Sequence, residues 1–297
     1  MDRDTFIITV YCLVVEYYAA VKEKHLLRRG GFAPELTDEE VITMEICGAY
    51  CKLHLDKDTF DYFHSHYQQF FPKLRDRPSF VRQAANLWQV KAAIWRLLVQ
   101  RSGQGTNPVQ VIDTVPLPVC TYTRSPRDRC FKTLADYGHC AAKKLSYYGF
   151  KLGLRVSAAG MITHFPLLNA RAHDVNHTNS LVEGFAGLCP ADKGFIDPFR
   201  QPLLEQRYGV KIVTPVKSNM TEIHPRALRN FCSRIRKIVE TVSSHLTERF
   251  AVAAIRVRDL WHFQHRLIRK VLAHTVMVFL NLRMGRDPLD LDGLVNA

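Results

Sequence analysis

The sequence predicts an α/β protein in which an all-α N-terminal region precedes a mixed sheet with helices on its faces. Three observations support this fold class. The first hundred or so of the 297 residues carry apolar positions at helical spacing. After residue 107, short apolar runs alternate with helical segments. The run RSGQG at residues 101–105 is typical of a flexible connection. We therefore expect a helical domain over residues 1–105 and a sheet-containing domain, with further helices at its C-terminal end, over residues 106–297.

The N-terminal region is expected to contain four helices. The clearest start is a capping box, in which Thr37 is the N-cap and Glu40 returns to its amide. Such a bundle is either a helix-turn-helix DNA reader or a domain that packs on its neighbour or mediates dimerisation. A net charge of +1 over residues 1–110 leaves both interpretations open. The other helices are expected at residues 6–22, at 58–70 and, as one long helix, after a turn at 76–79.

The second region is expected to build its sheet from apolar segments at residues 109–113, 149–158, 161–168 and 210–216, of which the middle two form a hairpin. Residues 122–144 are polar and basic and are expected to form a loop. Helices are expected at residues 180–186, 198–208 and 230–246, with two or more between 259 and 282.

Charge is concentrated in the second region. Residues 111–297 carry +12 of the net charge of +13, and the pI near 9.5 points to a polyanionic partner. No Gly-x-x-x-x-Gly-Lys-[Ser/Thr] loop suggests a nucleotide cofactor, and no Cys-x-x-Cys pair suggests a structural zinc ion. The apolar stretches at residues 6–15 and 271–282 are too short to span a bilayer, and a signal peptide's cationic region is missing. We expect a cytoplasmic, nucleoid-associated protein with no membrane partner.

Three carboxylates in this basic region are candidate catalytic and metal-binding residues. Asp113 ends an apolar strand, Asp192 lies near the end of another, and Glu240 lies on a helix. Two Mg²⁺ ions about 3.5–4 Å apart can activate an attacking oxygen and stabilise the leaving oxygen of a phosphodiester, and they need several converging carboxylates. Each acid alone has an ordinary alternative: Asp113 and Asp192 as turn residues, and Glu240 in an exposed ion pair with Arg236.

Basic residues near these acids are candidate DNA contacts. Arg236 precedes Glu240 by four residues and shares its helix face, and Lys193 follows Asp192. Two aromatic residues could stack on an unpaired base at a DNA end or belong to the core; they are Trp261 and Phe263. Further candidate phosphate contacts are Lys143, Lys144, Lys151, Arg155, Lys217, Arg256, Arg258, Arg266, Arg269 and Lys270.

The segments around these residues resemble a known family. They are VIDTVPLPVC at residues 111–120, ADYGHCAAKK at 135–144, YYGFKL at 147–152, ADKGF at 191–195 and IVETV at 238–242. In them the chain resembles the DDE transposases of bacterial insertion sequences, most closely those of the 982 family. The resemblance covers most of residues 36–285 and is strong over 109–245.

This resemblance implies both a fold and a mechanism. It implies an RNase H-like catalytic domain in which Asp113, Asp192 and Glu240 bind two Mg²⁺ ions, or Mn²⁺ in their place. Such an enzyme cuts DNA at the terminal inverted repeats of its element and transfers the freed 3′ hydroxyl to target DNA. It is expected to act as a homo-oligomer on DNA. Arg236 matches an Arg that many relatives carry four residues before the Glu.

The chain departs from the wider group at three positions. Ser233 stands where relatives often carry Tyr, and Thr247 where they often carry Lys. Gly153 stands where a His usually follows the matched strand. The first two departures concern the DNA-end contacts of the helix that carries Glu240, and they leave the proposed metal site unchanged.

Two other functions remain open from the sequence. One is a structure-specific metal-dependent endonuclease of the same fold, and the other is a catalytically silent, transposase-derived DNA-binding protein. The rival acids are Asp136, Asp197 and Glu248. The run HDVNH at residues 173–177 is expected to be a loop rather than a metal site.

Overall fold

The computed structural model describes residues 1–24, 33–140, 144–215 and 224–295. Within them the chain forms two compact units. The expected α/β class, with an all-α region before a mixed sheet flanked by helices, is confirmed. The helical unit consists of Met1–Arg101, Leu246–Val252 and Asp259–Ala297, and the sheet unit consists of Ser102–His245 and Ala253–Arg258.

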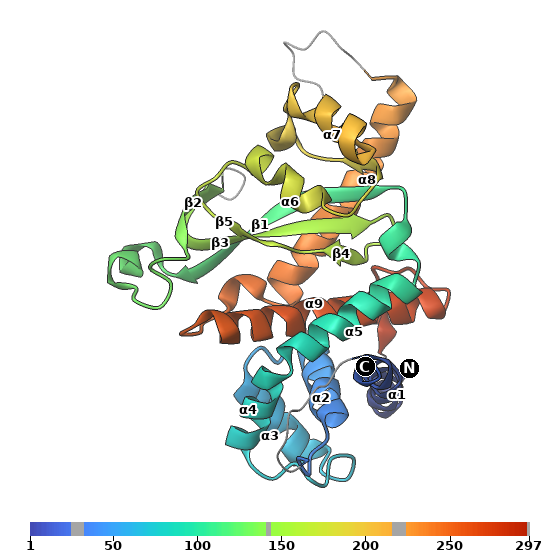
Figure 1. Ribbon diagram of the computed structural model, residues 1–297. Helices are drawn as coiled ribbons and strands as arrows, with labels where there is room; N and C mark the ends of the chain where they lie inside the picture. The colour runs from blue at the N-terminus through green and yellow to red at the C-terminus, as the bar shows by residue number, and fades with distance from the viewer. Residues whose placement is uncertain (25–32, 141–143, 216–223, 296–297) are drawn as a thin grey trace. The chain divides into compact units, whose positions relative to one another are not determined.

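Among the residues that the structure describes, the helical unit begins with five helices where four were expected. Thr37 and Glu40 form the predicted capping box at the start of the second. The long helix expected after residue 79 is instead two helices separated by Leu87. The first of these two starts at the N-cap Asp76, with a proline in its first turn. The five are α1 (Arg3–Lys22), α2 (Asp38–Tyr50), α3 (Asp56–His66), α4 (Arg77–Asn86) and α5 (Trp88–Arg101), as Figure 1 shows.

The C-terminal helix α9 (Leu260–Arg283) packs within the helical unit, against α2, α4 and α5. The sequence analysis assigned this segment to the sheet-containing domain, as two or more helices. Every residue of α9 from Leu267 to Asn281 is buried. A helix that is buried on all sides belongs to a core, but its sequence does not indicate which helices surround it.

The first helix, α1, has the length and hydropathy of a helix that could cross a membrane. The expectation that no segment here spans a bilayer rested on the shorter apolar stretch at residues 6–15. Eight residues of α1 are buried in the helical unit, among them Phe6, Val10 and Tyr17. Burial along one side is typical of a helix that contributes to the core of a bundle.

Charged side chains form a network in the core of the helical unit. Lys91 Nζ lies 2.6 Å from Glu45 Oε2, and neither side chain is more than 1% exposed. Arg269 donates a hydrogen bond to Asp56 Oδ1 (2.5 Å), and His265 Nδ1 lies 2.9 Å from Lys91 Nζ. Burial raises the pKa of Glu45 and lowers the pKa of Lys91. Because an unpaired buried charge is costly, these pairs favour one arrangement of α2, α3, α5 and α9.

The network corrects two predicted DNA contacts. Arg269 and Lys270 are buried, and Lys270 donates a hydrogen bond to the carbonyl of Phe250. The prediction that these two residues contact phosphates is wrong, because both side chains lie in the core. Burial lowers the pKa of Lys270 to about 7. Arg266 is partly exposed but is paired with Asp56 at 2.8 Å.

The sheet unit contains a mixed sheet in which β1 has an antiparallel neighbour on one side and a parallel one on the other. A parallel bridge between Val109 and Leu188 joins the start of β1 to β6. β1 (Gln110–Cys120) pairs antiparallel with β3 (Leu145–Ser157). β3 also pairs antiparallel with β2 (Asp136–Cys140), β4 (Ile162–His164) and β5 (Leu167–Asn169). β6 (Gly187–Pro190) pairs parallel with β7 (Val210–Val213).

The strands differ from the sequence expectation in two places. β1 is longer than the expected strand at residues 109–113 and includes Pro116 and Pro118. Proline removes a backbone donor, and it is tolerated here because this end of β1 is paired with β3 alone among the described strands. The segment 122–144, expected as a loop, contains the short helix η2 (Tyr122–Arg127) and β2.

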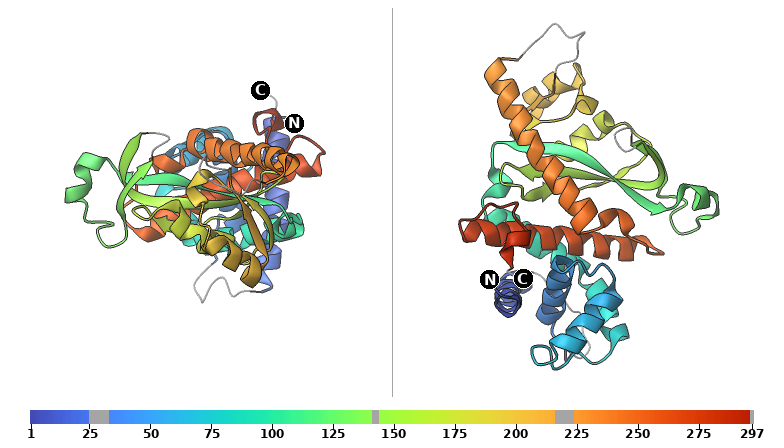
Figure 2. Two further views of the ribbon diagram at one scale, coloured as in Figure 1. Left: turned by 90° about the horizontal axis from the view of Figure 1, so that it is seen from above. Right: turned by 180° about the vertical axis from the view of Figure 1, so that it is seen from behind.

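Helices lie on both faces of this sheet. On one face, α6 (Thr178–Val182) and α7 (Arg200–Tyr208) share a core cluster with Ile112 of β1. On the other face, α8 (Arg226–Ser244) crosses β1 and β3, as Figure 2 shows. The buried residues of α8 form one stripe, which sets the rotation of this helix on the sheet: Cys232, Ile235, Val239 and Val242.

Candidate active site

Asp113 and Asp192 lie at equivalent points of two neighbouring parallel segments. The bridge between Val109 and Leu188 sets the register of β1 against β6. Each acid follows its bridge residue by four positions. The two carboxyl groups are close enough for Asp192 to raise the pKa of Asp113. The sheet therefore brings together two of the three predicted acids.

Asp113 is held inside the unit. Side chains alternate along a strand, and its neighbour Ile112 faces α6 and α7, so Asp113 faces the side that α8 covers. Burial is the main cause that raises the pKa of Asp113 to about 6. The carboxylates of Asp174 and Asp192 raise this pKa further, whereas a backbone N–H 2.8 Å away and Arg236 lower it. A buried carboxyl beside two others favours a nearby cation.

Arg236 links the second acid to the third. Its Nη2 lies 2.8 Å from Asp192 Oδ1 and 4.0 Å from Glu240 Oε1. Arg236 and Glu240 are one turn apart on α8, as the sequence predicts. The side chains of Asp192 and Glu240 are 58% and 63% exposed, so both can turn toward a ligand. Asp113, by contrast, is fixed in the sheet.

A fourth acid, Asp174, joins this group and was not predicted. Its Oδ1 accepts a hydrogen bond from Thr114 Oγ1 (2.9 Å) and pairs with Lys151 Nζ (2.9 Å). The sequence HDVNH indicates only a loop, and the structure places it in the short helix η3 (Asp174–His177). Only the register of β1 against β3, which brings Thr114 and Lys151 near one another, could have indicated this acid.

The predicted DNA contacts of the sheet unit divide by exposure. Lys151 donates to the carbonyl of Ala172 (2.7 Å) and to Asp174, and only 9% of it is exposed. Arg155 is buried and donates to the carbonyl of Leu181. The predicted phosphate contacts are therefore wrong for Lys151 and Arg155, whose donors are used internally. The exposed candidates are Lys144, Lys193, Arg256 and Arg258, and those outside the described residues are Lys143 and Lys217.

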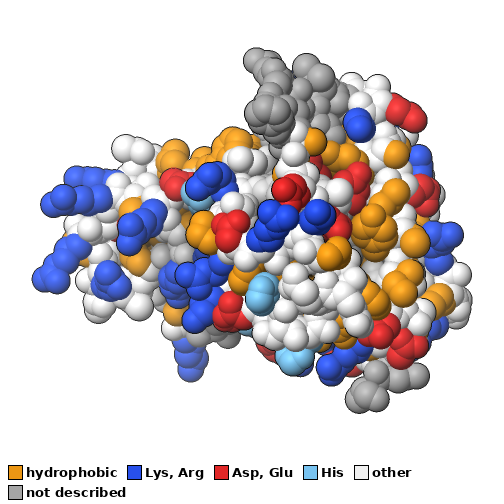
Figure 3. Space-filling model, turned by 90° about the horizontal axis from the view of Figure 1, so that it is seen from below, with side chains coloured by type: hydrophobic (Ala, Val, Ile, Leu, Met, Phe, Trp, Pro, Cys, Tyr) orange, Lys and Arg blue, Asp and Glu red, His pale blue; other side chains and the backbone are white. Residues whose placement is uncertain are grey.

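The arm between β1 and β2 adds basic residues that the sequence analysis did not single out. Arg124, Arg127, Arg129 and Lys132 are all exposed on it. Figure 3 shows Lys and Arg side chains gathered at the end of the molecule where this arm lies. Exposed cations on a folded arm form a surface that suits DNA phosphates.

The rival acids have other roles in the described structure. Asp136 accepts a hydrogen bond from the backbone N–H of Tyr137 (2.8 Å). Asp197 accepts from the backbone N–H of Arg200 (2.9 Å), at the start of α7. Glu248 lies in a π-helical turn, His245–Arg249, within the segment that belongs to the helical unit.

The structure shows the surroundings of the three residues at which the chain departs from the wider group. A side chain at Gly153 would place its Cβ 2.6 Å from Leu181 Cδ2 and 2.8 Å from Leu168 Cδ1. The His of the relatives would therefore clash with this core. Ser233 is exposed on α8, and Thr247 lies in the π-helical turn that follows it.

The carboxylates of Asp113, Asp192 and Glu240 suit a divalent cation, although they do not converge on one point. Carboxylate oxygens are the ligands that Mg²⁺ prefers. Among the side chains that the structure describes, no three of His, Cys, Asp or Glu lie close enough to hold one ion. Arg236 instead supplies the positive charge beside Asp192. In this structure Arg236 is thus the cationic partner of Asp192.

Comparison with known families identifies this arrangement. The transposase DDE domain family matches residues 103–260. The chain belongs to this transposase family. The matched segment is more than half of the chain, and it contains Asp113, Asp192, Arg236 and Glu240. No curated protein and no solved structure matches the chain.

The transposase domain sets the type of chemistry. It implies DNA as the partner and transposase-type cleavage and strand transfer as the activity, and such domains typically use divalent metals. The match begins after α5 and ends at the first residue of α9. The role of the transposase's helical unit must therefore be argued from its own residues.

Proposed function

We propose that this transposase cuts DNA at the ends of an insertion sequence and joins the freed 3′ hydroxyl to target DNA, with two Mg²⁺ ions, or Mn²⁺ in their place. Asp113, Asp192 and Glu240 are the proposed ligands. The observation that supports this most is the placement of Asp113 beside Asp192, with Arg236 linking Asp192 to Glu240. Asp113, Asp192 and Glu240 of the transposase domain supply the several carboxylates that two-metal phosphoryl transfer needs.

Each side chain has its own role in this proposal. Asp113, partly buried on β1, supplies a carboxylate in a fixed position and must be ionised to act. Asp192 and Glu240 are exposed and turn toward it. Bound metal ions would activate the attacking oxygen and stabilise the leaving oxygen of the phosphodiester. Arg236, once it releases Asp192, can pair with a phosphate, to which a guanidinium offers two parallel hydrogen bonds.

Exposed cations support DNA as the substrate. Lys193 is exposed directly beside Asp192, and the arm carries four further cations, from Arg124 to Lys132. The proposed partners are the terminal inverted repeats of the element and the target DNA, bound by a homo-oligomer that pairs the two ends. A cytoplasmic, nucleoid-associated location accords with this substrate. The sequence segments around the three acids favour a member of the 982 family.

Strand transfer separates a transposase from an endonuclease of the same fold. The full-length chain is incubated with a plasmid that carries its coding region and flanking DNA, a second plasmid as target, and Mg²⁺, Mn²⁺ or EDTA. We expect breaks at fixed positions that flank the coding region, and products in which those ends are joined to the second plasmid. Both should need a metal ion. Cleavage without joining would favour the endonuclease, and binding without cleavage would favour the silent DNA-binding protein.

A further inference from the structure

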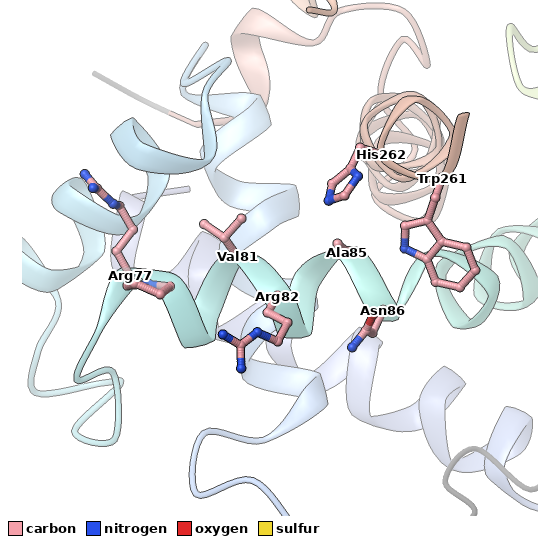
Figure 4. Close-up of a pocket in the computed structure, with 8 residues that line it drawn as sticks. Arg77, Val81, Arg82, Ala85, Asn86, Trp261 and His262 are labelled. Atoms are coloured by element: carbon pink, nitrogen blue, oxygen red, sulfur yellow. The ribbon is translucent and has the colours of Figure 1, made fainter. Parts of the chain in front are cut away.

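In the helical unit, α4 stands as a ridge with a hollow on each side. One hollow, of about 510 Å³, lies between α4 and the first turn of α9, and we call it the α4 hollow. The other, of about 380 Å³, lies on the opposite flank. Arg82 and Asn86 line both hollows, so they are on the crest of the ridge. Figure 4 shows these two side chains pointing to the same side of α4, with Trp261 and His262 coming from α9.

The inner side of α4 is firmly held, so the crest has a defined position. Phe80 and Ala84 are 1% exposed and pack inward. Gln83 donates hydrogen bonds to the carbonyl of Leu36 (3.0 Å) and to Asp38 Oδ1 (2.7 Å). Arg82 and Asn86, one turn apart, are both exposed. A rigid helix with polar side chains on its outer face is the arrangement used to read base edges.

The α4 hollow carries exposed cations, although the net charge of the N-terminal region is near zero. Arg77, Arg82 and His262 line it, and no described Asp or Glu side chain does. His262 is paired with Asp259 at 2.8 Å, and Asp38 lines the hollow on the opposite flank. Arg77 and Arg82 are exposed and can therefore offer guanidinium donors to an anionic partner.

Trp261 gives the α4 hollow a flat, fixed wall. Its side chain is 43% exposed, and its ring meets that of Trp88 edge to face, with centroids 5.5 Å apart. Phe263, two residues later, is 1% exposed and belongs to the core. Of the two aromatic residues singled out in the sequence, only Trp261 is therefore available to a ligand.

We propose that α4 reads the sequence of duplex DNA. In this proposal, Arg82 and Asn86 face base edges in the major groove, where Arg suits guanine and Asn suits adenine. Arg77 contacts a flanking phosphate, and Trp261 packs against the sugar–phosphate backbone. This inference rests on the proposed action on DNA and deepens it, because it assigns recognition of the element's ends to the helical unit and the chemistry to the sheet unit.

The test is enrichment of binding sites from a pool of random duplexes by the full-length chain. We compare the wild type with Arg82→Ala and Asn86→Ala, both on the exposed crest. Arg96→Ala is the matched control, since Arg96 is exposed on α5 and lines neither hollow. The wild type should enrich a sequence motif. Each crest variant should lose preference at particular base positions and bind the enriched duplex about ten-fold more weakly or worse. Arg96→Ala should enrich the same motif.

Two results would overturn the proposal: a wild type that enriches no motif, or crest variants that enrich the wild-type motif with unchanged affinity. Asp113→Asn separates this failure from failure of the proposed function. It should enrich the wild-type motif while losing cleavage. If the wild type cleaves DNA and the crest variants still enrich its motif, the proposed role of α4 is refuted while the proposed function stands.

Discussion

Arg236 Nη2 lies 2.8 Å from Asp192 Oδ1, so a guanidinium neutralises one of the acids that the proposed metal site needs. The same group is 4.0 Å from Glu240 Oε1 and lowers the pKa of Asp113. In the proposed mechanism, Arg236 and a divalent cation therefore compete for the same carboxylates. We therefore propose two positions for Arg236: one in which it pairs with the acids and one in which it pairs with a DNA phosphate.

Arg236→Gln is expected to separate metal binding from catalysis. Without the competing guanidinium, Mn²⁺ should bind the DNA-free protein as tightly as in the wild type or more tightly. Cleavage at saturating metal should fall about ten-fold or more, because a phosphate loses its charged partner. Calorimetric titration and a cleavage time course measure the two effects. Arg234→Gln, an exposed arginine on the same helix, is the control. Weaker Mn²⁺ binding by Arg236→Gln would contradict the competition.

Asp113→Asn is expected to stabilise the metal-free protein at neutral pH. The pKa of Asp113 in the folded state is about 6, above its ordinary value of 3.8. The native state therefore holds this proton more tightly than the unfolded state, and the wild type loses stability as the pH rises from about 4 to about 6. Above that range the full cost, roughly 3 kcal/mol, is present. Asparagine cannot ionise and avoids it.

Thermal unfolding at about pH 5 and about pH 8 measures this effect. The gain in melting temperature of Asp113→Asn over the wild type should be larger at the higher pH. An equal gain at both values would show that the charge of Asp113 is not responsible.

Lys151 and Lys193 are expected to respond oppositely to mutation. Lys151→Met removes the partner of Asp174 inside the sheet unit and should lower the unfolding midpoint, with no change in the salt dependence of DNA binding. Lys193→Ala, at an exposed site beside Asp192, should leave stability unchanged and reduce the slope of log affinity against log salt by about 1. DNA binding at several salt concentrations distinguishes them. A reduced slope for Lys151→Met would show that Lys151 reaches a phosphate.

Removing only one partner of the buried pair of Lys91 and Glu45 should lower the free energy of unfolding more than removing both. Lys91→Met should lower the free energy of unfolding by about 3–5 kcal/mol, because it leaves Glu45 without its main partner in the core. Adding Glu45→Leu should recover much of this loss. The exposed pair of Arg75 and Glu35, 2.9 Å apart, is the control, and Arg75→Met should cost less than about 1 kcal/mol. Urea unfolding measures these three variants and the single variant Glu45→Leu, and additive losses in the double variant would contradict the account.

The sequence predicted those structural features that depend on contacts between residues close together in the chain. The capping box of Thr37 and Glu40 requires only a few adjacent residues, and it forms as expected. The apolar run before Asp113 does form part of a strand, but β1 continues past Asp113 to Cys120. The helix that places Arg236 one turn before Glu240 is also a local feature and forms as expected.

Features that depend on distant partners were not predictable from the sequence. The basic side chain of Arg269 and the acid of Asp56 are far apart in the chain, and only packing of α9 against the first helices makes them a buried pair. Asp174 joins the site because of the register between β1 and β3. Trp261 and Phe263 look alike in the sequence, and the packing of α9 decides which one faces solvent.

Cleavage of DNA that carries the element's ends tests the central claim most directly. In Mg²⁺, Asp113→Asn, Asp192→Asn and Glu240→Gln should each cut roughly a hundred- to a thousand-fold more slowly than the wild type, while binding the same DNA about as tightly. Cleavage at the wild-type rate by any one of them would remove that residue from the site, and wild-type rates for all three would contradict the proposed mechanism.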